Sequence, residues 1–396
     1  MLTKEQFQSI IEKYDLTQTG YKREFYLKRI IPALKRKEII ILKGVRRCGK
    51  TTIMLQLIQE LLGQGVELRD ILYVNLDDFN FLPYLSIDLL EFILSIRNTK
   101  NRLHLFLDEI QKIPQFESWL RTQYDRGTNI KFIVSGSNST LLAKDLATLL
   151  TGRNLTYEIF PLDYKECKEF GYDNLNNYIT YGGFPEIVLE KNGDNKMNLL
   201  RNYVSDIINK DVILRRDVKD PRQLLLFAQF LLQNPGMRLS INRLSKQIGL
   251  SKDTVIKYLS YLVDAYLIFE VPFFSYSAKS KFIPGNVPKY YVLDPGFYIV
   301  NTPRIERSKL FETAIAIKLH KAKEVYYWKQ KNEVDFVSGD NAFNVVSSET
   351  MPQRERVGLE ELQKHFKYIK KSHIIGPSKI SRDDMYIDLK TFLESP

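Results

Sequence analysis

Residues 44–51 read Gly44-Val45-Arg46-Arg47-Cys48-Gly49-Lys50-Thr51, which fits the phosphate-binding pattern GxxxxGK(S/T). The β-branched run Glu38-Ile39-Ile40-Ile41-Leu42 comes before it and is typical of a buried parallel strand. The apolar spacing over residues 51–58 predicts a helix after it. Strand, glycine loop and helix therefore follow one another in the order that a nucleotide-binding loop needs, and this context argues against a chance glycine turn.

The residue types of this loop suit the binding of a phosphate chain. Its glycines let backbone N–H groups curl around an anion, which also feels the positive end of the following helix dipole. We expect Lys50 to reach the β- and γ-phosphates and Thr51 to hold Mg²⁺. The predicted nucleotide-binding residues are Gly44, Val45, Arg46, Arg47, Cys48, Gly49, Lys50, Thr51 and Thr52.

Length and composition narrow the class of protein. A chain of 396 residues with 44% hydrophobic residues is expected to form two or three domains. No apolar run approaches the roughly 20 residues that span a bilayer, and the start Met-Leu-Thr-Lys-Glu-Gln lacks a signal-peptide segment. We therefore expect a soluble, cytoplasmic protein without a membrane partner. Cys48 and Cys167 alone make neither a disulfide framework nor a cysteine zinc site.

The charge balance is basic. Lys and Arg number 58 against 47 Asp and Glu, which gives a net charge of +11. This excess favours an anionic partner, with nucleic acid as the leading candidate. A heat-stable cytoplasmic protein would carry similarly abundant charge of both signs. Charge alone therefore does not decide between these interpretations.

Three further strands are predicted after the loop, over residues 70–76, 102–107 and 131–134. Helical patterns over 87–97 and 116–125 separate them. This alternation predicts right-handed crossovers and an α/β fold with a parallel sheet flanked by helices. In such sheets the ligand lies at the carboxyl ends of the strands, where polar residues follow each of these runs.

Two adjacent carboxylates, Asp108 and Glu109, follow the hydrophobic strand. In this arrangement Asp108 is expected to hold the Mg²⁺ shell while Glu109 acts as general base on an attacking water. A phosphate-transferring kinase does not need that Glu because it must exclude water. Asp77 or Asp78 is an alternative for this role, although a place at the rim of the pocket suits both better.

Two more residues are predicted to serve catalysis. Ser135 follows the next core strand, where it would contact the γ-phosphate or the attacking water, unless it only starts a turn. Arg153 could neutralise transition-state charge in its own subunit or in a neighbour's site, or it could be ordinary surface charge. Its competitors are the other arginines of the region. The predicted catalytic set is Glu109, Lys50, Arg153 and Ser135, with Arg46, Arg47, Arg215 and Arg216 as alternatives for the arginine.

Residues 241–262 have the rhythm of a helix-turn-helix, with Gly249 at the turn and Ser251 as helix cap. Strand-like stretches at 266–274 and 289–293 follow, as in the wing of a winged helix. The second helix of such a unit enters the major groove. The predicted DNA contacts are Lys246, Lys252, Thr254, Lys257 and Tyr258, beside a core of Val255, Ile256, Leu259 and Leu262. Winged helices also serve as protein-packing modules, which is the alternative.

The ordered motifs resemble the AAA-type ATPases that are widespread in archaea and some bacteria, in which the AAA domain precedes a domain of unknown function. The resemblance covers essentially the whole chain and implies ATP as nucleotide and Mg²⁺ as cofactor. It also implies an ATPase domain at 1–160, a helical and winged-helix domain at 161–303 and a restriction-endonuclease-like domain at 304–396. The residues that carry it are 44–51, 107–112, 135–137, 150–153, 161–162 with Glu166, 182–186 and 211–216.

The last of these domains departs from a working nuclease. Such nucleases hold Mg²⁺ with a helix Glu, a strand Asp and an E-x-K on the next strand. Glu312 and Asp335 fill the first two places, but the third reads Asn344-Val345-Val346 and lacks both the Glu and the Lys. We therefore expect no nuclease activity, and a fold retained to bind DNA, partners or other subunits.

Together these patterns predict Mg-dependent ATP hydrolysis coupled to sequence-independent DNA binding or remodelling, as in a translocase or a branched-DNA factor. An arginine that acts in trans would require a homo-oligomer, for which a ring is one arrangement. The alternative is a nucleotide-controlled signalling or defence switch whose partner is a protein.

Overall fold

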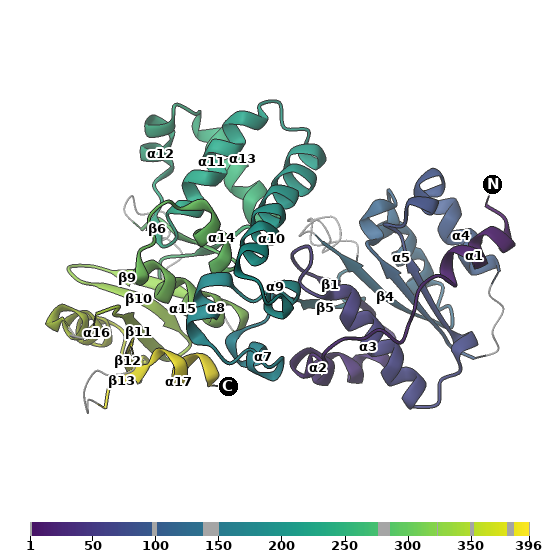
Figure 1. The fold of residues 1–396 in the computed structure, drawn as a ribbon, viewed down its shortest axis with the longest axis horizontal. Helices are drawn as coiled ribbons and strands as arrows, with labels where there is room; N and C mark the ends of the chain where they lie inside the picture. Colours follow the sequence, from purple (N-terminus) through teal and green to yellow (C-terminus); the bar gives the residue numbers. More distant parts are fainter. Residues whose placement is uncertain are drawn as a thin grey trace. The chain divides into compact units, whose positions relative to one another are not determined.

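The computed structural model describes residues 2–96, 101–137, 150–275, 286–322, 324–348, 352–377 and 384–395. The chain divides into two compact units, Met1–Phe160 and Pro161–Pro396. Figure 1 shows the first in purple to blue and the second in teal to yellow. Within the described residues, no helix has the length and apolar character that crossing a membrane requires.

The first unit is built on a five-stranded parallel sheet in the order β2-β3-β4-β1-β5. Its β1, β3 and β4 are almost wholly buried, which explains their continuous apolar runs. All carboxyl ends share one edge of the sheet. The predicted parallel P-loop sheet is thus confirmed, with strands β1 (Ile39–Lys43), β2 (Ile71–Asn75), β3 (Leu103–Asp108), β4 (Ile130–Gly136) and β5 (Asn154–Glu158).

Helices cover both faces of this sheet (Figure 1). One face packs against α1, α4 and α5, whose buried side chains form one core with the strands. Helices α2 and α3 lie on the other face and contact each other. The helices are α1 (Lys4–Ile11), α2 (Glu24–Leu34), α3 (Lys50–Gly63), α4 (Ile87–Ser95) and α5 (Phe116–Asp125), with short 3-10 turns at Leu68–Asp70, Phe79–Tyr84 and Ile110–Lys112.

The second unit begins with helices. Helix α10 (Gly193–Asp206) continues into a π-helical stretch, Ile207–Leu214. A helix pair follows, α12 (Ile241–Ile248) and α13 (Lys252–Asp264), with Gly249 left-handed at the turn (φ 69°) and Ser251 capping α13. The others are α7 (Tyr164–Glu169), α8 (Leu175–Tyr181), α9 (Pro185–Leu189), α11 (Pro221–Gln233) and α14 (Pro295–Asn301).

Two sheets complete this unit. A small antiparallel sheet in the order β6-β8-β7 comprises β6 (Met237–Arg238), β7 (Ile268–Val271) and β8 (Lys289–Val292). A five-stranded mixed sheet has the order β13-β12-β11-β10-β9. Its strands are β9 (Tyr326–Lys329), β10 (Glu333–Ser338), β11 (Asn341–Val345), β12 (Lys371–Gly376) and β13 (Tyr386–Asp388). The helices of this region are α15 (Arg307–Ala322), α16 (Gln353–His365) and α17 (Leu389–Glu394).

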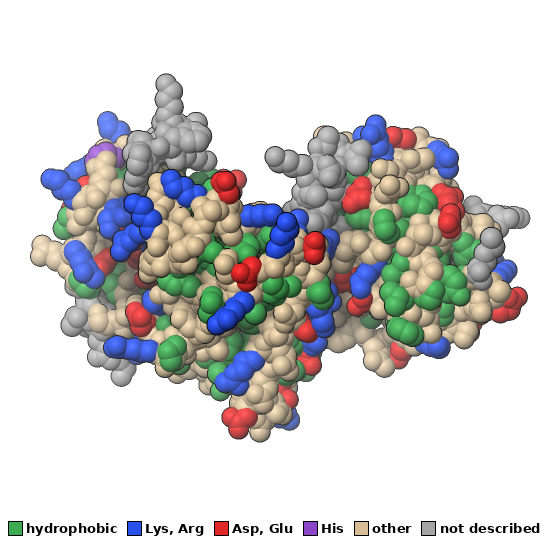
Figure 2. All heavy atoms as spheres, turned by 90° about the horizontal axis from the view of Figure 1, so that it is seen from above, with side chains coloured by type: hydrophobic (Ala, Val, Ile, Leu, Met, Phe, Trp, Pro, Cys, Tyr) green, Lys and Arg blue, Asp and Glu red, His purple; other side chains and the backbone are tan. Residues whose placement is uncertain are grey.

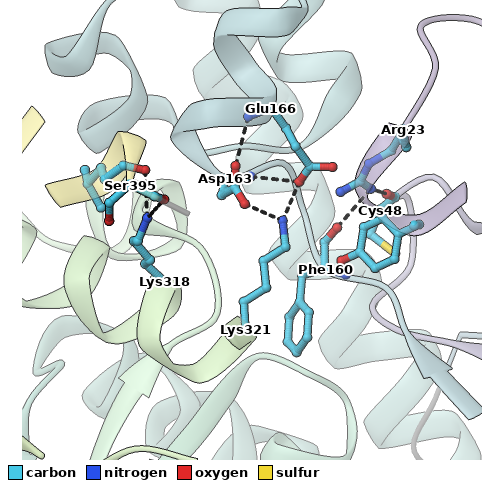
Figure 3. Close-up of polar contacts among 10 residues, drawn as sticks. Arg23, Cys48, Phe160, Asp163, Glu166, Lys318, Lys321 and Ser395 are labelled. Atoms are coloured by element: carbon cyan, nitrogen blue, oxygen red, sulfur yellow. Dashed lines mark hydrogen bonds and ion pairs between the residues drawn. The ribbon is translucent and has the colours of Figure 1, made fainter. Parts of the chain in front are cut away.

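A buried ion cluster joins the start of the second unit to α15 (Figure 3). Lys321 Nζ lies 2.6 Å from Asp163 Oδ2 and also contacts Glu166 Oε2. Asp163 and Glu166 also form the capping box of α7, so the same two carboxylates cap the N-terminus of that helix. On the same side of α15, Lys318 Nζ donates to the carbonyls of Leu393 and Ser395. Helix α15 therefore holds segments from both ends of this unit.

We predict that Lys321→Met lowers the free energy of unfolding of the second unit by about 3–5 kcal/mol, because it removes the ammonium that pairs with the buried Glu166 and the partly buried Asp163. Burial alone would raise the pKa of Asp163, but Lys321 brings it below its ordinary value. The stabilisation is therefore present above about pH 4 and is lost as the pH falls further.

Urea unfolding at pH 7 and at pH 3 measures both effects. The control is Lys309→Met on the same helix, which breaks a half-exposed pair with Glu306 and should cost less than about 1 kcal/mol. Equal losses for the two variants would contradict the role of the cluster.

Candidate active site

The glycine loop has the backbone that its sequence demands. It connects β1 to α3, and Arg47 and Gly49 adopt left-handed conformations with φ of 66° and 98°. A Cβ on Gly44 would lie 2.0 Å from the carbonyl oxygen of Ile159, so only glycine fits between the loop and the end of β5. Cys48 Sγ contacts the same carbonyl at 3.2 Å. The Ile159 carbonyl at the end of β5 therefore fixes the position of the glycine-loop backbone.

Lys50 is folded into this loop. Its side chain is buried, and Nζ donates to the carbonyls of Gly44 and Val45 at 3.0 Å each. Phosphate oxygens are stronger acceptors for an ammonium than neutral carbonyls. The loop thus holds a preplaced cation, and the residues fit the phosphate chain of a nucleotide.

Asp108 is the centre of the site. Its Oδ2 accepts hydrogen bonds from Thr51 Oγ1 at 2.6 Å and from Tyr73 OH at 3.0 Å, and its Oδ1 accepts one from Ser135 Oγ. Burial, and then the neighbouring Glu109, raise the pKa of Asp108, while these hydroxyl donors lower it. Carboxylate and hydroxyl oxygens are hard ligands of the kind Mg²⁺ prefers. Thr51 and Asp108, predicted as metal residues, therefore form a fitting pair.

Glu109 follows with a left-handed backbone (φ 56°), unusual for a residue with a side chain. Its N–H donates to Ser135 Oγ at 3.1 Å, and Gln111 Nε2 donates to its Oε2. The structure therefore brings Ser135 together with both acidic residues. Strained backbone at such a position is typical of residues that serve function.

Asp77 and Asp78 have other partners. Asp77 pairs with Lys112 at 2.6 Å, and Asp78 accepts a hydrogen bond from Tyr14 OH at 2.6 Å. Burial and this bond to Asp78 raise the pKa of Tyr14. Both acids lie just beyond the end of β2, and each is held by a partner outside the glycine loop.

The prediction that Arg153 acts in its own subunit is wrong. Its carbonyl accepts from Ile39 N–H at the amino end of β1, whereas the glycine loop follows Lys43 at the carboxyl end, about 13 Å away along the strand. The guanidinium pairs with Asp125 at 2.8 Å. The order of motifs along the chain did not reveal that Arg153 precedes its strand. A role in a neighbour's site stays a prediction.

Sequence reasoning missed two supporting residues. Arg23 is buried, and its Nη1 donates to the carbonyl of Cys48 at 2.9 Å and to that of Phe160 at 3.0 Å (Figure 3). Tyr73 holds Asp108 from the neighbouring strand. Arg23 gave no local signal, because its contact partners lie 25 and 137 residues away. Tyr73 carried a weak signal as a hydroxyl within a buried strand.

The predicted DNA-binding residues divide into two groups. Lys246, Lys252 and Lys257 are exposed on α12 and α13, and Thr254 is partly buried with its hydroxyl 2.8 Å from Ser251 Oγ. The prediction for Tyr258 is wrong.

Tyr258 is only 7% exposed, packs against Phe227 and lies 3.4 Å from the Asp220 carbonyl. Ile256, expected in the core, is instead 54% exposed. The buried residues of α13 are Val255, Tyr258, Leu259 and Leu262, which follow the i, i+3, i+4, i+7 spacing of one helix face. Ile256 lies outside this face.

A polar pocket of about 500 Å³ lies in the C-terminal sheet region, lined in part by Glu312, Glu333 and Asp335. Burial raises the pKa of Glu312 to about 8 and that of Asp335 to about 6. Lys289 Nζ lies 2.7 Å from Glu333 and 3.7 Å from Asp335. The Lys289 ammonium thus pairs with two of these three acids, Glu333 and Asp335.

Asn344 is the residue expected from the sequence at the position of a nuclease's metal-binding Glu. Its Oδ1 accepts from the N–H of Asp335 and its Nδ2 donates to the carbonyl of Glu355. Across the described ranges, no group of three or more His, Cys, Asp or Glu residues is arranged to hold a metal ion.

Residues 36–168 match the family model of an AAA domain, and residues 172–303 match a domain of unknown function (DUF8612). The uncharacterized protein MJ1544 of Methanocaldococcus jannaschii is 32% identical over 336 residues, which are 77% of this chain and 73% of the relative. An uncharacterized Haemophilus influenzae protein is 28% identical over 296 residues, which are 69% of this chain and 72% of the relative.

Among solved structures, the Holliday junction branch migration motor RuvB of Thermotoga maritima aligns with a TM-score of 0.34 and 17% identity, over 64% of this chain and 90% of that one. The ORC1 protein of Aeropyrum pernix in complex with DNA aligns with a TM-score of 0.34 and 13% identity, over 72% and 93%. Likenesses this distant carry no functional argument. The site centred on Asp108 thus lies in an AAA domain, and the chain belongs to the family of AAA-domain proteins that includes MJ1544 of M. jannaschii.

Proposed function

We propose that this protein hydrolyses ATP in a Mg²⁺-dependent reaction at the site around Asp108. One observation carries the proposal: the buried Asp108 carboxylate is hydrogen-bonded to the first helical threonine after the glycine loop and lies next to Glu109. A metal-binding pair and a candidate general base are therefore adjacent to a preformed phosphate cradle.

Each residue has a defined task in this proposal. Thr51 and Asp108 would hold Mg²⁺, which when bound neutralises charge on the β- and γ-phosphates. Lys50 leaves the carbonyls of its own loop for the phosphate oxygens. Glu109 accepts a proton from the attacking water, and Ser135 holds both acidic residues in place through its hydroxyl.

We predict that Lys50→Ala abolishes ATP binding and turnover, while Glu109→Gln keeps binding and lowers turnover by about 10²-fold or more. The reason is that Lys50 contacts the ground-state phosphates, whereas Glu109 is needed only when water attacks. Phosphate release and equilibrium binding of a fluorescent ATP analogue measure the two effects.

The matched control is Lys22→Ala, which removes an exposed lysine paired with Glu60 on the same unit. It should leave both quantities unchanged. Full activity of Glu109→Gln would assign the base to another residue.

We further propose that hydrolysis is coupled to sequence-independent DNA binding by the second unit. The helix pair α12–α13 with the sheet β6-β8-β7 is interpreted as a winged helix, and three of its lysines are exposed. Lys and Arg side chains are spread over the visible face of this unit, interspersed with acidic and apolar ones (Figure 2, left). Such scattered charge suits phosphate contacts better than base readout.

The triple variant Lys246→Ala/Lys252→Ala/Lys257→Ala is expected to weaken duplex DNA binding and to reduce the salt slope of log K by roughly 0.9 for each phosphate that is no longer neutralised. Fluorescence anisotropy over a salt series measures both quantities. The charge-matched control replaces Lys4, Lys13 and Lys28, which are exposed on the first unit.

An equal effect of the two triple variants would mean that the net charge of the protein, and not this helix pair, determines DNA binding. ATP turnover that is indifferent to duplex, single-stranded and branched DNA would favour the alternative of a nucleotide-controlled switch with a protein partner.

A role for Arg153 in a neighbour's site would require a homo-oligomer. Neither Arg153→Ala nor Glu109→Gln should then hydrolyse ATP alone, but a mixture should recover activity, because one interface combines an intact Glu109 with an intact Arg153. Arg121→Ala is the control, since Arg121 also pairs with Asp125. A mixture as inactive as its components would exclude the trans arginine.

A further inference from the structure

Gln111 lies in the 3-10 turn directly after the two acidic residues of the site. Its Nε2 donates to Glu109 Oε2 and lies 3.3 Å from Ser137 Oγ at the end of β4. One amide therefore joins the candidate general base to the next strand. Neither the glycine-loop pattern nor the paired acids of the sequence assigned a role to Gln111.

The direction of this amide follows from charge. The carboxylate of Glu109 only accepts hydrogen bonds when ionised, so the NH₂ group of Gln111 must face it and the carbonyl oxygen must point away. That oxygen, Oε1, is buried, and no residue within the described ranges donates to it. Burying an amide oxygen without a donor costs free energy. A donor is therefore expected to arrive in the working state of the site.

We propose that Gln111 positions the attacking water for hydrolysis, an inference that rests on the ATPase function proposed above. A water beside Glu109 has two O–H groups. Glu109 accepts the proton that leaves, and Gln111 Oε1 accepts the hydrogen bond of the other O–H, while Nε2 keeps the Glu109 carboxylate turned toward the same water.

The hydrolysis that this arrangement serves forms one bond to phosphorus and breaks one. The water oxygen forms a bond to the γ-phosphorus as the bond from that phosphorus to the β,γ-bridging oxygen breaks. The proton released by the water passes to Glu109, and the products are ADP and inorganic phosphate. Gln111 gains and loses no proton, so its contribution is geometric.

A matched control exists in the same unit. Gln123 is buried on α5, and its Nε2 donates to Glu91 Oε1 at 3.2 Å. This is the same pairing of amide and carboxylate, placed on a helix that covers the sheet. Gln123→Ala therefore removes a comparable structural bond without touching the site.

The test compares the full-length chain with Gln111→Ala, Gln111→Glu and Gln123→Ala in steady-state phosphate release. Gln111→Ala is expected to lower kcat by about 10-fold or more with an unchanged Kd for a non-hydrolysable ATP analogue. Gln111→Glu removes the amide donor and places a second carboxylate beside Glu109, so kcat should fall at least as far as in Gln111→Ala, again with an unchanged Kd for the analogue. Gln123→Ala should change none of these quantities.

Each outcome has a defined meaning. If wild-type protein releases no phosphate under any condition, the proposed ATPase function fails and not this inference alone. If wild type is active and Gln111→Ala matches it, or exceeds it because the amide restrains Glu109, the inference is overturned. Should Gln111→Ala lose its cooperative unfolding transition, Gln111→Asn replaces it; the shorter side chain cannot hold Glu109 and water together, and full activity of that variant would contradict the role.

Discussion

The site of the first unit depends on the hydrogen bonds that the buried Asp108 carboxylate accepts. Three hydroxyl groups donate to it, from the start of α3, from β2 and from β4, while Asp108 itself ends β3. One side chain thus ties the glycine-loop helix to three neighbouring strands. An acid buried this deeply is stable as an anion only with such donors or a cation, so the geometry that holds the sheet edge together also suits the Mg²⁺ that we propose there.

Neighbouring side chains also contact more than one part of the site. Ser135 donates to Asp108 and accepts from the backbone of Glu109, so the positions of the two acids are coupled through one hydroxyl. Behind the glycine loop, Arg23 and Ile159 fix the backbone from segments on either side of it in sequence. The loop is therefore shaped before a nucleotide binds, which lowers the entropy that binding must overcome.

Much of the first unit could be predicted because its signals are local. The glycine loop, the buried strands and the acidic pair each depend on a few adjacent residues, and parallel strands bring their carboxyl ends to one edge. Arg23 and Gln111 could not be assigned, since their roles come from contacts that the fold creates. On α13, the polar Tyr258 was expected to contact DNA and the apolar Ile256 to lie in the core, but helix spacing decides otherwise. Tyr258 shares the buried face of Val255, Leu259 and Leu262, and Ile256 does not. Arg153 was misplaced because a motif's order along the chain does not say at which end of a strand it lies.

Electron paramagnetic resonance with Mn²⁺ in place of Mg²⁺ can measure whether Thr51 and Asp108 form a nucleotide-dependent metal site. With a non-hydrolysable ATP analogue, we expect one tightly bound Mn²⁺ per chain whose signal shows coupling to phosphorus and is lost in Asp108→Asn. Mn²⁺ binding that does not depend on the nucleotide, or that survives Asp108→Asn unchanged, would contradict this expectation.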